Sequence, residues 1–183
     1  MPGNPYLLAP EVNANPLLSD SWSRCQRYGL DPATEDFPRL RAGELADRLA
    51  SHRSLQQLAQ PVVDALSRQV ADLQSVVVLS DPSGLVLHTV GDTQAMQKAQ
   101  RVALAPGNLW SESGRGTNAI GTALVIDDGC EIDGRQHFLT RNQNLYCAAM
   151  PLQRPDGSIA GVLDISGPAD FPHQPTFGRV QAA

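Results

Sequence analysis

Apolar residues recur first with a helical spacing and then with a strand spacing along the chain. From Leu45 to Leu73 most of them fall three or four positions apart, which predicts one long helix with a single apolar face. Pro61 interrupts this segment, and because proline has no backbone N–H, we expect a kink or a new helix start there. A shorter helix is predicted over residues 17–25, after a proline-rich lead over residues 1–16 that we expect to be irregular.

The pattern then alternates with a period of two, which is typical of half-buried strands. Strands are predicted over residues 75–80, 85–90, 129–133, 145–153 and 158–167. Asp81-Pro82-Ser83-Gly84 has the composition of a type I turn, and Arg154-Pro155-Asp156-Gly157 is a second tight turn. Because tight turns join antiparallel neighbours, the predicted fold class is α+β, an antiparallel sheet with helices packed against it.

Three further helices complete the pattern. One is predicted over residues 92–102 with Asp92 as its cap, and one over residues 117–125, where it opens from a glycine-rich stretch. The last begins within residues 172–183, where Pro175 suits a first helical turn. It meets no stop signal before the sequence ends, so we expect the natural chain to continue as a linker helix.

Composition narrows the class of protein. A chain of 183 residues holds one packed domain and an extension, and its net charge of −5, without a run of Lys or Arg, argues against a nucleic-acid-binding module. No stretch approaches the roughly 18 apolar residues of a membrane helix, and the start of the chain is unlike a secretion signal. Three cysteines without a CxxC pair indicate a reduced, cytoplasmic protein.

The glycine-rich segment over residues 109–124 is the most distinctive candidate for chemistry. Its glycines permit close backbone approach, and Thr117 is expected to cap a helix whose free N–H groups favour an anionic or oxygen-rich ligand. The alternative is that the glycines serve only tight turns and helix-to-sheet packing. Spacing alone favours this alternative, because the run fits neither the Walker nor the dinucleotide pattern.

Several motifs in a fixed order carry a family resemblance. They are Ser21-Trp22-Ser23-Arg24-Cys25, Trp110-Ser111-Glu112, Gly116-Thr117-Asn118-Ala119-Ile120-Gly121-Thr122, Gly134-Arg135-Gln136-His137-Phe138, Cys147-Ala148-Ala149-Met150-Pro151 and Gly161-Val162-Leu163-Asp164-Ile165-Ser166-Gly167. From about Leu17 onward, the chain resembles the sensory GAF domain of sigma-54-dependent activators of acetoin and glycerol catabolism. Gln136 departs from the family, which usually has Glu there, so the resemblance implies no salt bridge or metal role for this position.

The resemblance implies a GAF/PAS-like, six-stranded antiparallel sheet with helices packed on one face and a ligand pocket on the other. It divides the chain into an irregular lead and N-terminal helical extension over residues 1–50, the GAF domain over residues 51–172, and the start of a linker helix over residues 173–183. That linker would lead to an ATPase domain absent from this chain.

The implied pocket is roofed by the loop and helix over residues 110–124 and by the loop that carries His137. Strand alternation places Tyr146 on one face of its strand and Cys147 and Ala149 on the other, and the pattern leaves open which face is inward. The candidate ligand-binding residues are Trp110, Thr117, Asn118, Ile120, His137, Phe138, Tyr146, Cys147 and Ala149.

Individual positions in this set leave alternatives open. His137 either hydrogen-bonds a small hydroxy-carbonyl ligand or is tied to the backbone, and as a loop residue we expect it to contribute little to the core. Trp110 is expected to pack rather than to contact ligand. Asp164, in an otherwise apolar strand, is expected to be structural, for example by bonding nearby backbone N–H groups.

The predicted function is therefore sensing of a small organic effector without catalysis, cofactor or metal, by a homodimer. Sigma-54 RNA polymerase and DNA would be reached only through an ATPase domain and a helix-turn-helix domain outside this chain. One alternative is a GAF-type free methionine sulfoxide reductase that uses Cys130 and Cys147, although nothing marks either as a reactive thiolate. The other is a metal- or cofactor-bearing GAF sensor, against which the four histidines are widely spread.

Overall fold

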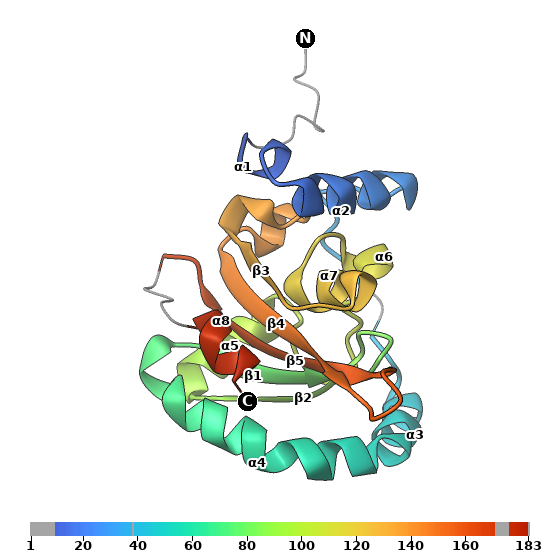
Figure 1. Ribbon diagram of the computed structural model, residues 1–183, viewed down its shortest axis with the longest axis vertical. Helices are drawn as coiled ribbons and strands as arrows, with labels where there is room; N and C mark the ends of the chain where they lie inside the picture. Colours follow the sequence, from blue (N-terminus) through green and yellow to red (C-terminus); the bar gives the residue numbers. More distant parts are fainter. Residues whose placement is uncertain (1–9, 38, 171–175, 183) are drawn as a thin grey trace.

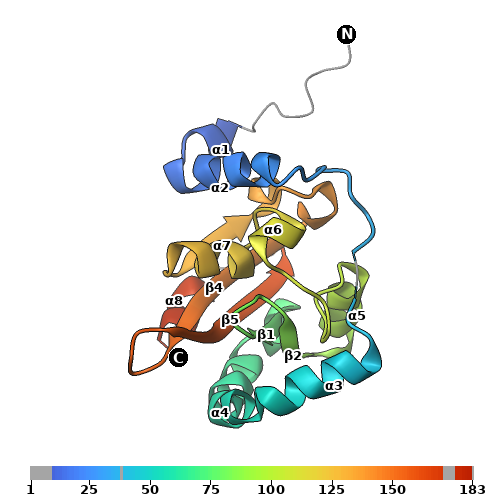
Figure 2. The same ribbon diagram turned by 90° about the vertical axis from the view of Figure 1, so that its right-hand side faces the viewer.

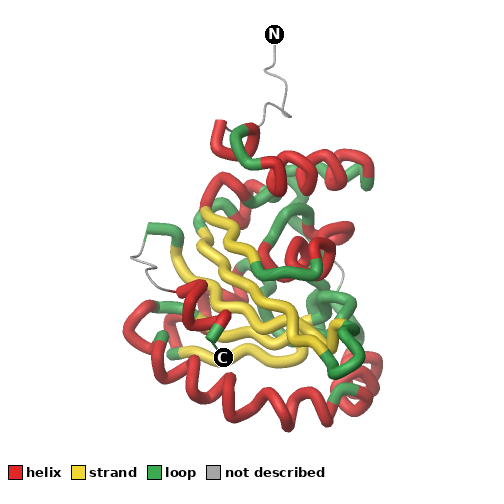
Figure 3. Tube along the Cα trace, in the orientation of Figure 1, coloured by secondary structure: helices red, strands yellow, loops and turns green. Residues whose placement is uncertain are grey.

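The centre of the protein is an antiparallel sheet. The computed structural model describes residues 10–37, 39–170 and 176–182, and in this part of the chain the sheet has five strands in the order β2-β1-β5-β4-β3 (Figures 1 and 3). The strands are β1 (Val76–Ser80), β2 (Val86–Gly91), β3 (Cys130–Asp133), β4 (Leu145–Gln153) and β5 (Ile159–Pro168). All five predicted strands are confirmed, whereas the expectation of six strands is wrong for the described residues.

Both tight turns have the predicted chemistry. Gly84 donates its N–H to the carbonyl of Asp81 over 3.0 Å, and the Asp81 carboxylate accepts from the backbone N–H of Ser83 at 2.7 Å. The second turn closes in the same way, with Gly157 donating to the carbonyl of Arg154 at 2.9 Å. Both glycines adopt positive φ angles, +83° and +81°, which side chains disfavour.

The helices differ from the prediction at three places. They are α1 (Pro10–Asn13), α2 (Pro16–Arg27), α3 (Ala42–Ser51), α4 (Arg53–Gln69), α5 (Thr93–Arg101), α6 (Glu112–Arg115), α7 (Ala119–Ile126) and α8 (Thr176–Gln181). The single long helix is divided at His52, and α4 runs unbroken through Pro61. Pro61 removes the donor to the carbonyl of Gln57. Both residues are exposed, so this carbonyl is open to solvent and its lost helical bond is tolerated.

The third difference is at the start of the chain. The lead expected to be irregular contains α1, whose Val12 is fully buried in the core, so packing gives this short helix a partner. At the other end, a helix is confirmed within the predicted segment as α8 over Thr176–Gln181, and residues 172–175 lie outside the described residues.

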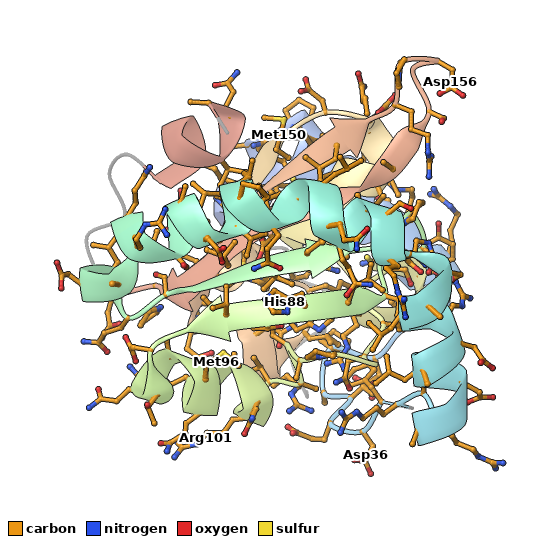
Figure 4. All side chains as sticks on the ribbon, turned by 90° about the horizontal axis from the view of Figure 1, so that it is seen from below. Asp36, His88, Met96, Arg101, Met150 and Asp156 are labelled. Atoms are coloured by element: carbon orange, nitrogen blue, oxygen red, sulfur yellow. The ribbon has the colours of Figure 1, made fainter. Side chains whose placement is uncertain are left out.

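Helices cover both faces of the sheet, which corrects the expectation of helices on one face only. We call inner the face that carries Val76, Val78, Cys147, Ala149 and Val162, and outer the face that carries Val77, Leu79, Tyr146, Ala148, Leu163 and Ile165. Figure 2 shows α2, α6 and α7 on one side of the sheet and α4 on the other. Figure 4 shows α4 crossing the outer face above β1 and β2, with His88 labelled beneath it.

The N-terminal extension is part of the inner-face core. Leu18, Trp22 and Cys25 of α2 are buried with α7 residues in one cluster. Trp22 also donates its indole N–H to the carbonyl of Gln136 over 2.8 Å and meets the Phe138 ring edge-on, with centroids 5.1 Å apart. The extension and the sheet therefore pack as one unit.

We predict that Gly116→Ala destabilises the fold. Gly116 has φ of +68°, and an added Cβ would lie only 2.6 Å from Cβ of Phe138, so both the backbone and the buried ring would have to move. The unfolding free energy should fall by about 1–3 kcal/mol. The matched control is Gly43→Ala in α3, where an added Cβ meets nothing within 4 Å. Thermal melts of both variants check this, and equal melting temperatures would contradict it.

Candidate ligand-binding site

A cavity of about 580 Å³ opens between α5 and the inner face of the sheet. Its apolar wall includes Val76, Ala95, Ala99, Val102, Leu104 and Leu145. The two alanines lie one turn apart on α5, and their small side chains leave space between the helix and the sheet. A hollow of this size that combines an apolar wall with polar groups is typical of small-molecule sites.

The polar part of the wall comes from the strand ends and the rim. Gln143 and Asn144 precede β4, and Ser166 lies near the end of β5. Lys98 and Arg101 lie at the outer rim on α5, where both are exposed, and the ammonium of Lys98 donates to Gln74 Oε1 over 2.6 Å. The charges are thus at the mouth of the cavity, while Ser166 supplies a buried hydroxyl on its floor.

A buried carboxylate stands directly behind that floor. Ser166 Oγ donates to Asp164 Oδ2 at 2.7 Å, and it also lies 3.0 Å from Cys147 Sγ. Asp164 is fully buried, and its Oδ1 has no hydrogen-bond partner among the described residues. Burial raises the pKa of Asp164 to about 7, although the Ser166 hydrogen bond opposes the shift. The expectation that Asp164 bonds backbone N–H groups is wrong.

The two inner-face thiols near this carboxylate are chemically quiet. Burial is the main cause that raises the pKa of Cys130 to about 12, and it also raises the pKa of Cys147 well above its ordinary range. Both thiols are therefore protonated at neutral pH, and a thiol rather than a thiolate is a poor nucleophile. In the described part of the chain, no group of three or more His, Cys, Asp or Glu residues is placed to hold a metal ion.

A buried arginine holds the end of α5 that borders the cavity. Arg115 donates to the carbonyls of Val102 and Leu109 at 3.2 and 3.1 Å, and its guanidinium lies 4.1 Å from the ring centroid of Phe37 and 5.0 Å from that of Trp110. Burial lowers the pKa of Arg115 to about 10, so it remains a cation facing the carbonyl end of α5. Trp110 packs as expected and donates its indole N–H to Ala103.

Seven of the nine residues predicted from the sequence lie in or beside the inner-face core, away from the cavity wall. Asn118, rather than Thr117, caps α7: its Oδ1 accepts from the N–H of Gly121 at 2.8 Å. Thr117 instead hydrogen-bonds Ser21 Oγ at 2.7 Å, in a buried network whose charged members, Glu112 and Arg24, are 2.5 Å apart. The remaining inner-face members are Ile120, Phe138, Cys147, Ala149 and the packed Trp110.

His137 and Tyr146 occupy different surroundings from those expected. His137 is fully buried, so the expectation that it contributes little to the core is wrong. Its Nδ1 lies 3.1 Å from the carbonyl of Gly134, its Nε2 has no partner among the described residues, and burial lowers its pKa to about 4. Tyr146 lies on the outer face and donates to Glu131, so it does not join the others.

The sequence did not indicate that α5 forms a wall of the cavity or that Ser166 lies on its floor. Ser166 lies within the quoted Gly161–Gly167 motif, and a serine two positions after an aspartate on a strand shares its face, which was a usable signal. The alanines of α5 gave no such signal, because alanine at helical spacing is equally typical of ordinary packing.

Comparisons with known proteins identify the family to which this fold belongs. The model of the MimR N-terminal domain family matches residues 6–176. The acetoin dehydrogenase operon transcriptional activator AcoR of Bacillus subtilis is 33% identical over 94% of this chain and 29% of its own length. The acetoin catabolism regulatory protein of Cupriavidus necator is 32% identical over 88% of this chain and 25% of its own length. The propane 2-monooxygenase operon transcriptional activator MimR of Mycolicibacterium goodii is 32% identical over 87% of this chain and 26% of its own length.

A solved structure supports the same assignment at the level of the fold. The E. coli DhaR(N)–DhaL complex contains a chain that superposes with a TM-score of 0.86 at 21% identity, over 92% of this chain and 57% of that one. This chain spans about a quarter to a third of the length of the activators named above. Among the described helices, none is long and apolar enough to cross a membrane. The chain belongs to the MimR N-terminal domain family, the sensory domains of sigma-54 activators of the MimR and AcoR type.

Proposed function

We propose that this domain senses a small organic effector in the cytoplasm and thereby controls a sigma-54-dependent transcription activator. The observation that carries the proposal is the cavity between α5 and the inner face, with its apolar wall and its single buried polar end. A ligand there would contact α5 on one side and β5 on the other. Any preference for one arrangement of these elements would shift the population of states.

The signal would leave the domain through the element that follows β5. Helix α8 packs on the outer face against β4 and β5, with Val180 buried in that core. Because the cavity floor and the seat of α8 share strand β5, a ligand-dependent shift of this strand changes the support of α8. In the proposed whole protein, α8 leads towards an AAA+ ATPase domain and a helix-turn-helix domain that act on sigma-54 RNA polymerase and DNA.

The predicted site residues on the inner face lie outside the cavity wall, and this proposal gives them a supporting role. Cys147 and Ala149 of β4 pair with Ser166 and Asp164 of β5, whereas Asn118 caps α7 and Ile120 lies within it. We assign Trp110, Thr117, His137 and Phe138 to the packing of the inner-face core rather than to direct contact at the cavity. The effectors suggested by the relatives' names are acetoin and compounds of similar size.

A protein input is the second candidate, and the observation that favours it is the solved complex of DhaR(N) with DhaL. In that case the surface, rather than the cavity, would receive the signal. We propose no catalytic role, since the two thiols near the site are protonated and buried.

We predict that Ala99→Leu blocks effector binding. The larger side chain would project from α5 into the cavity, so a metabolite retained by the wild-type protein in native mass spectrometry should be lost. The matched control is Gln97→Leu, which places the same side chain on the exposed face of α5. If the Ala99→Leu variant retains the same metabolite, the effector does not bind in this cavity. If the domain binds a protein partner and no metabolite, the second candidate function is favoured.

We also predict a homodimer that uses the exposed face of α4. Leu58 on this helix is 80% exposed, whereas Ala59, Val63 and Leu66 pack on the outer face. A large exposed apolar side chain beside a helix–sheet core favours self-association. Leu58→Glu should halve the mass measured by light scattering, while Gln57→Glu should not. A wild-type mass near that of one chain contradicts the prediction.

A further inference from the structure

The polar end of the cavity is built from two side chains of one strand. Ser166 and Asp164 are two positions apart on β5, so both point to the inner face. Their neighbours across the sheet are small: Ala149 pairs with Asp164, and Cys147 pairs with Ser166. Because Ser166 lines the cavity and donates to Asp164, the carboxylate lies one hydrogen bond behind the cavity wall.

This carboxylate is poorly explained as a structural group. Asp164 takes part in none of the ion pairs among the described residues, and one of its two oxygens has no partner. Burying a carboxylate with an unsatisfied oxygen costs stability, and an apolar residue at this position would avoid that cost. A buried acid beside a cavity, with incomplete hydrogen bonding, is instead typical of a site that meets a ligand.

No nearby charge determines whether Asp164 of the Ser166–Asp164 pair is ionised. From β4 and β3 the titratable groups near Asp164 are the protonated thiols of Cys147 and Cys130, and from α6 comes Glu112, which Arg24 already neutralises. Among the described residues, the cations at the cavity are Lys98 and Arg101, both on the exposed rim.

We propose that Ser166 is the polar contact of the sensing cavity, that Asp164 sets whether Ser166 accepts or donates, and that the ionised pair selects a small uncharged molecule bearing a hydroxyl group. This inference rests on the proposed sensing function and names the ligand class of the same site.

The selection follows from the single hydrogen of a serine hydroxyl. When Asp164 is ionised it only accepts, so Ser166 gives its hydrogen to Asp164 and turns oxygen lone pairs towards the cavity. A ligand hydroxyl then donates to Ser166, whereas a carbonyl has nothing to donate. When Asp164 is protonated it donates to Ser166, whose hydrogen becomes free for a ligand carbonyl.

The change between these two hydrogen-bonding arrangements falls in the neutral pH range. Burial raises the pKa of Asp164 to about 7, so the ionised form gains as the pH rises from 6 to 8. Carbonyl binding should therefore weaken over this interval. A ligand hydroxyl can donate to Ser166 or accept from it, so alcohol binding should change less and the preference for the alcohol should rise. His137 stays neutral throughout, because burial lowers its pKa to about 4. His88 pairs with Leu79, whose side chain lies on the outer face, so it is remote from the cavity.

The test uses cyclohexanol and cyclohexanone, which share one ring and differ only in a hydroxyl or a carbonyl. Dissociation constants of both are measured by NMR titration of the ¹⁵N-labelled chain at pH 6 and pH 8. In the wild type, the preference for the alcohol over the ketone should rise about fivefold to tenfold between these pH values, as a gain or loss of roughly one net hydrogen bond implies. Asp164→Asn keeps the shape without titrating, so its preference should not change with pH.

Two further variants separate this inference from general effects. Ser166→Ala removes the contact itself and should abolish the preference at both pH values. Asp170→Asn removes a carboxylate at the rim of the same cavity and should behave like the wild type. Thermal melts establish that each variant is folded.

An alcohol preference that is independent of pH in the wild type, or that persists in Ser166→Ala, overturns the inference. So does failure of the wild type to bind either compound. The proposed function is tested separately by Ala99→Leu. If this variant loses the retained metabolite, sensing is assigned to the cavity even when the Ser166–Asp164 pair plays no part in it.

Discussion

Strand β5 pairs with β1 on one side and with β4 on the other, and the register of these pairings decides which side chains meet in each core. Both faces of the sheet are covered by helices, so both sets of alternating residues are buried. A slip of one residue would exchange Asp164 and Ser166 for Leu163 and Ile165, placing a carboxylate beneath α4 and α8. The cavity floor, the inner-face core and the seat of α8 all depend on this register.

The inner face is closed by segments that lie far apart in the sequence. Helix α2 reaches the core with Trp22 and Leu18, and its Arg24 pairs with the buried Glu112 of α6. The hydroxyls of Ser21 and Thr122 also donate to the Glu112 carboxylate, at 2.7 and 3.2 Å. A charge-assisted network of this kind supports a buried acid that would otherwise destabilise the fold. It holds the N-terminal extension to α6 and α7.

Two buried carboxylates on the same side of the sheet therefore have different surroundings. Glu112 has a cation and two hydroxyls, and these contacts account for its burial. Asp164 has one hydroxyl and an unpartnered oxygen, beside a cavity. The contacts of Glu112 are those that a structural role requires. The unpartnered oxygen of Asp164 fits our proposal of a site that is stabilised only when a ligand binds.

The sequence by itself determined the strands, both turns, the cap of α5 and the family, because these depend on local alternation, on Asp and Gly at turn positions, and on motifs read in order. It did not locate the break at His52 instead of Pro61, since whether a lost helical bond is tolerated depends on exposure. It also could not show that helices cover both faces or that His137 is fully buried. Those facts, like the meeting of Ser166 with α5 across the cavity, depend on contacts between residues distant in the chain, which only the tertiary structure decided.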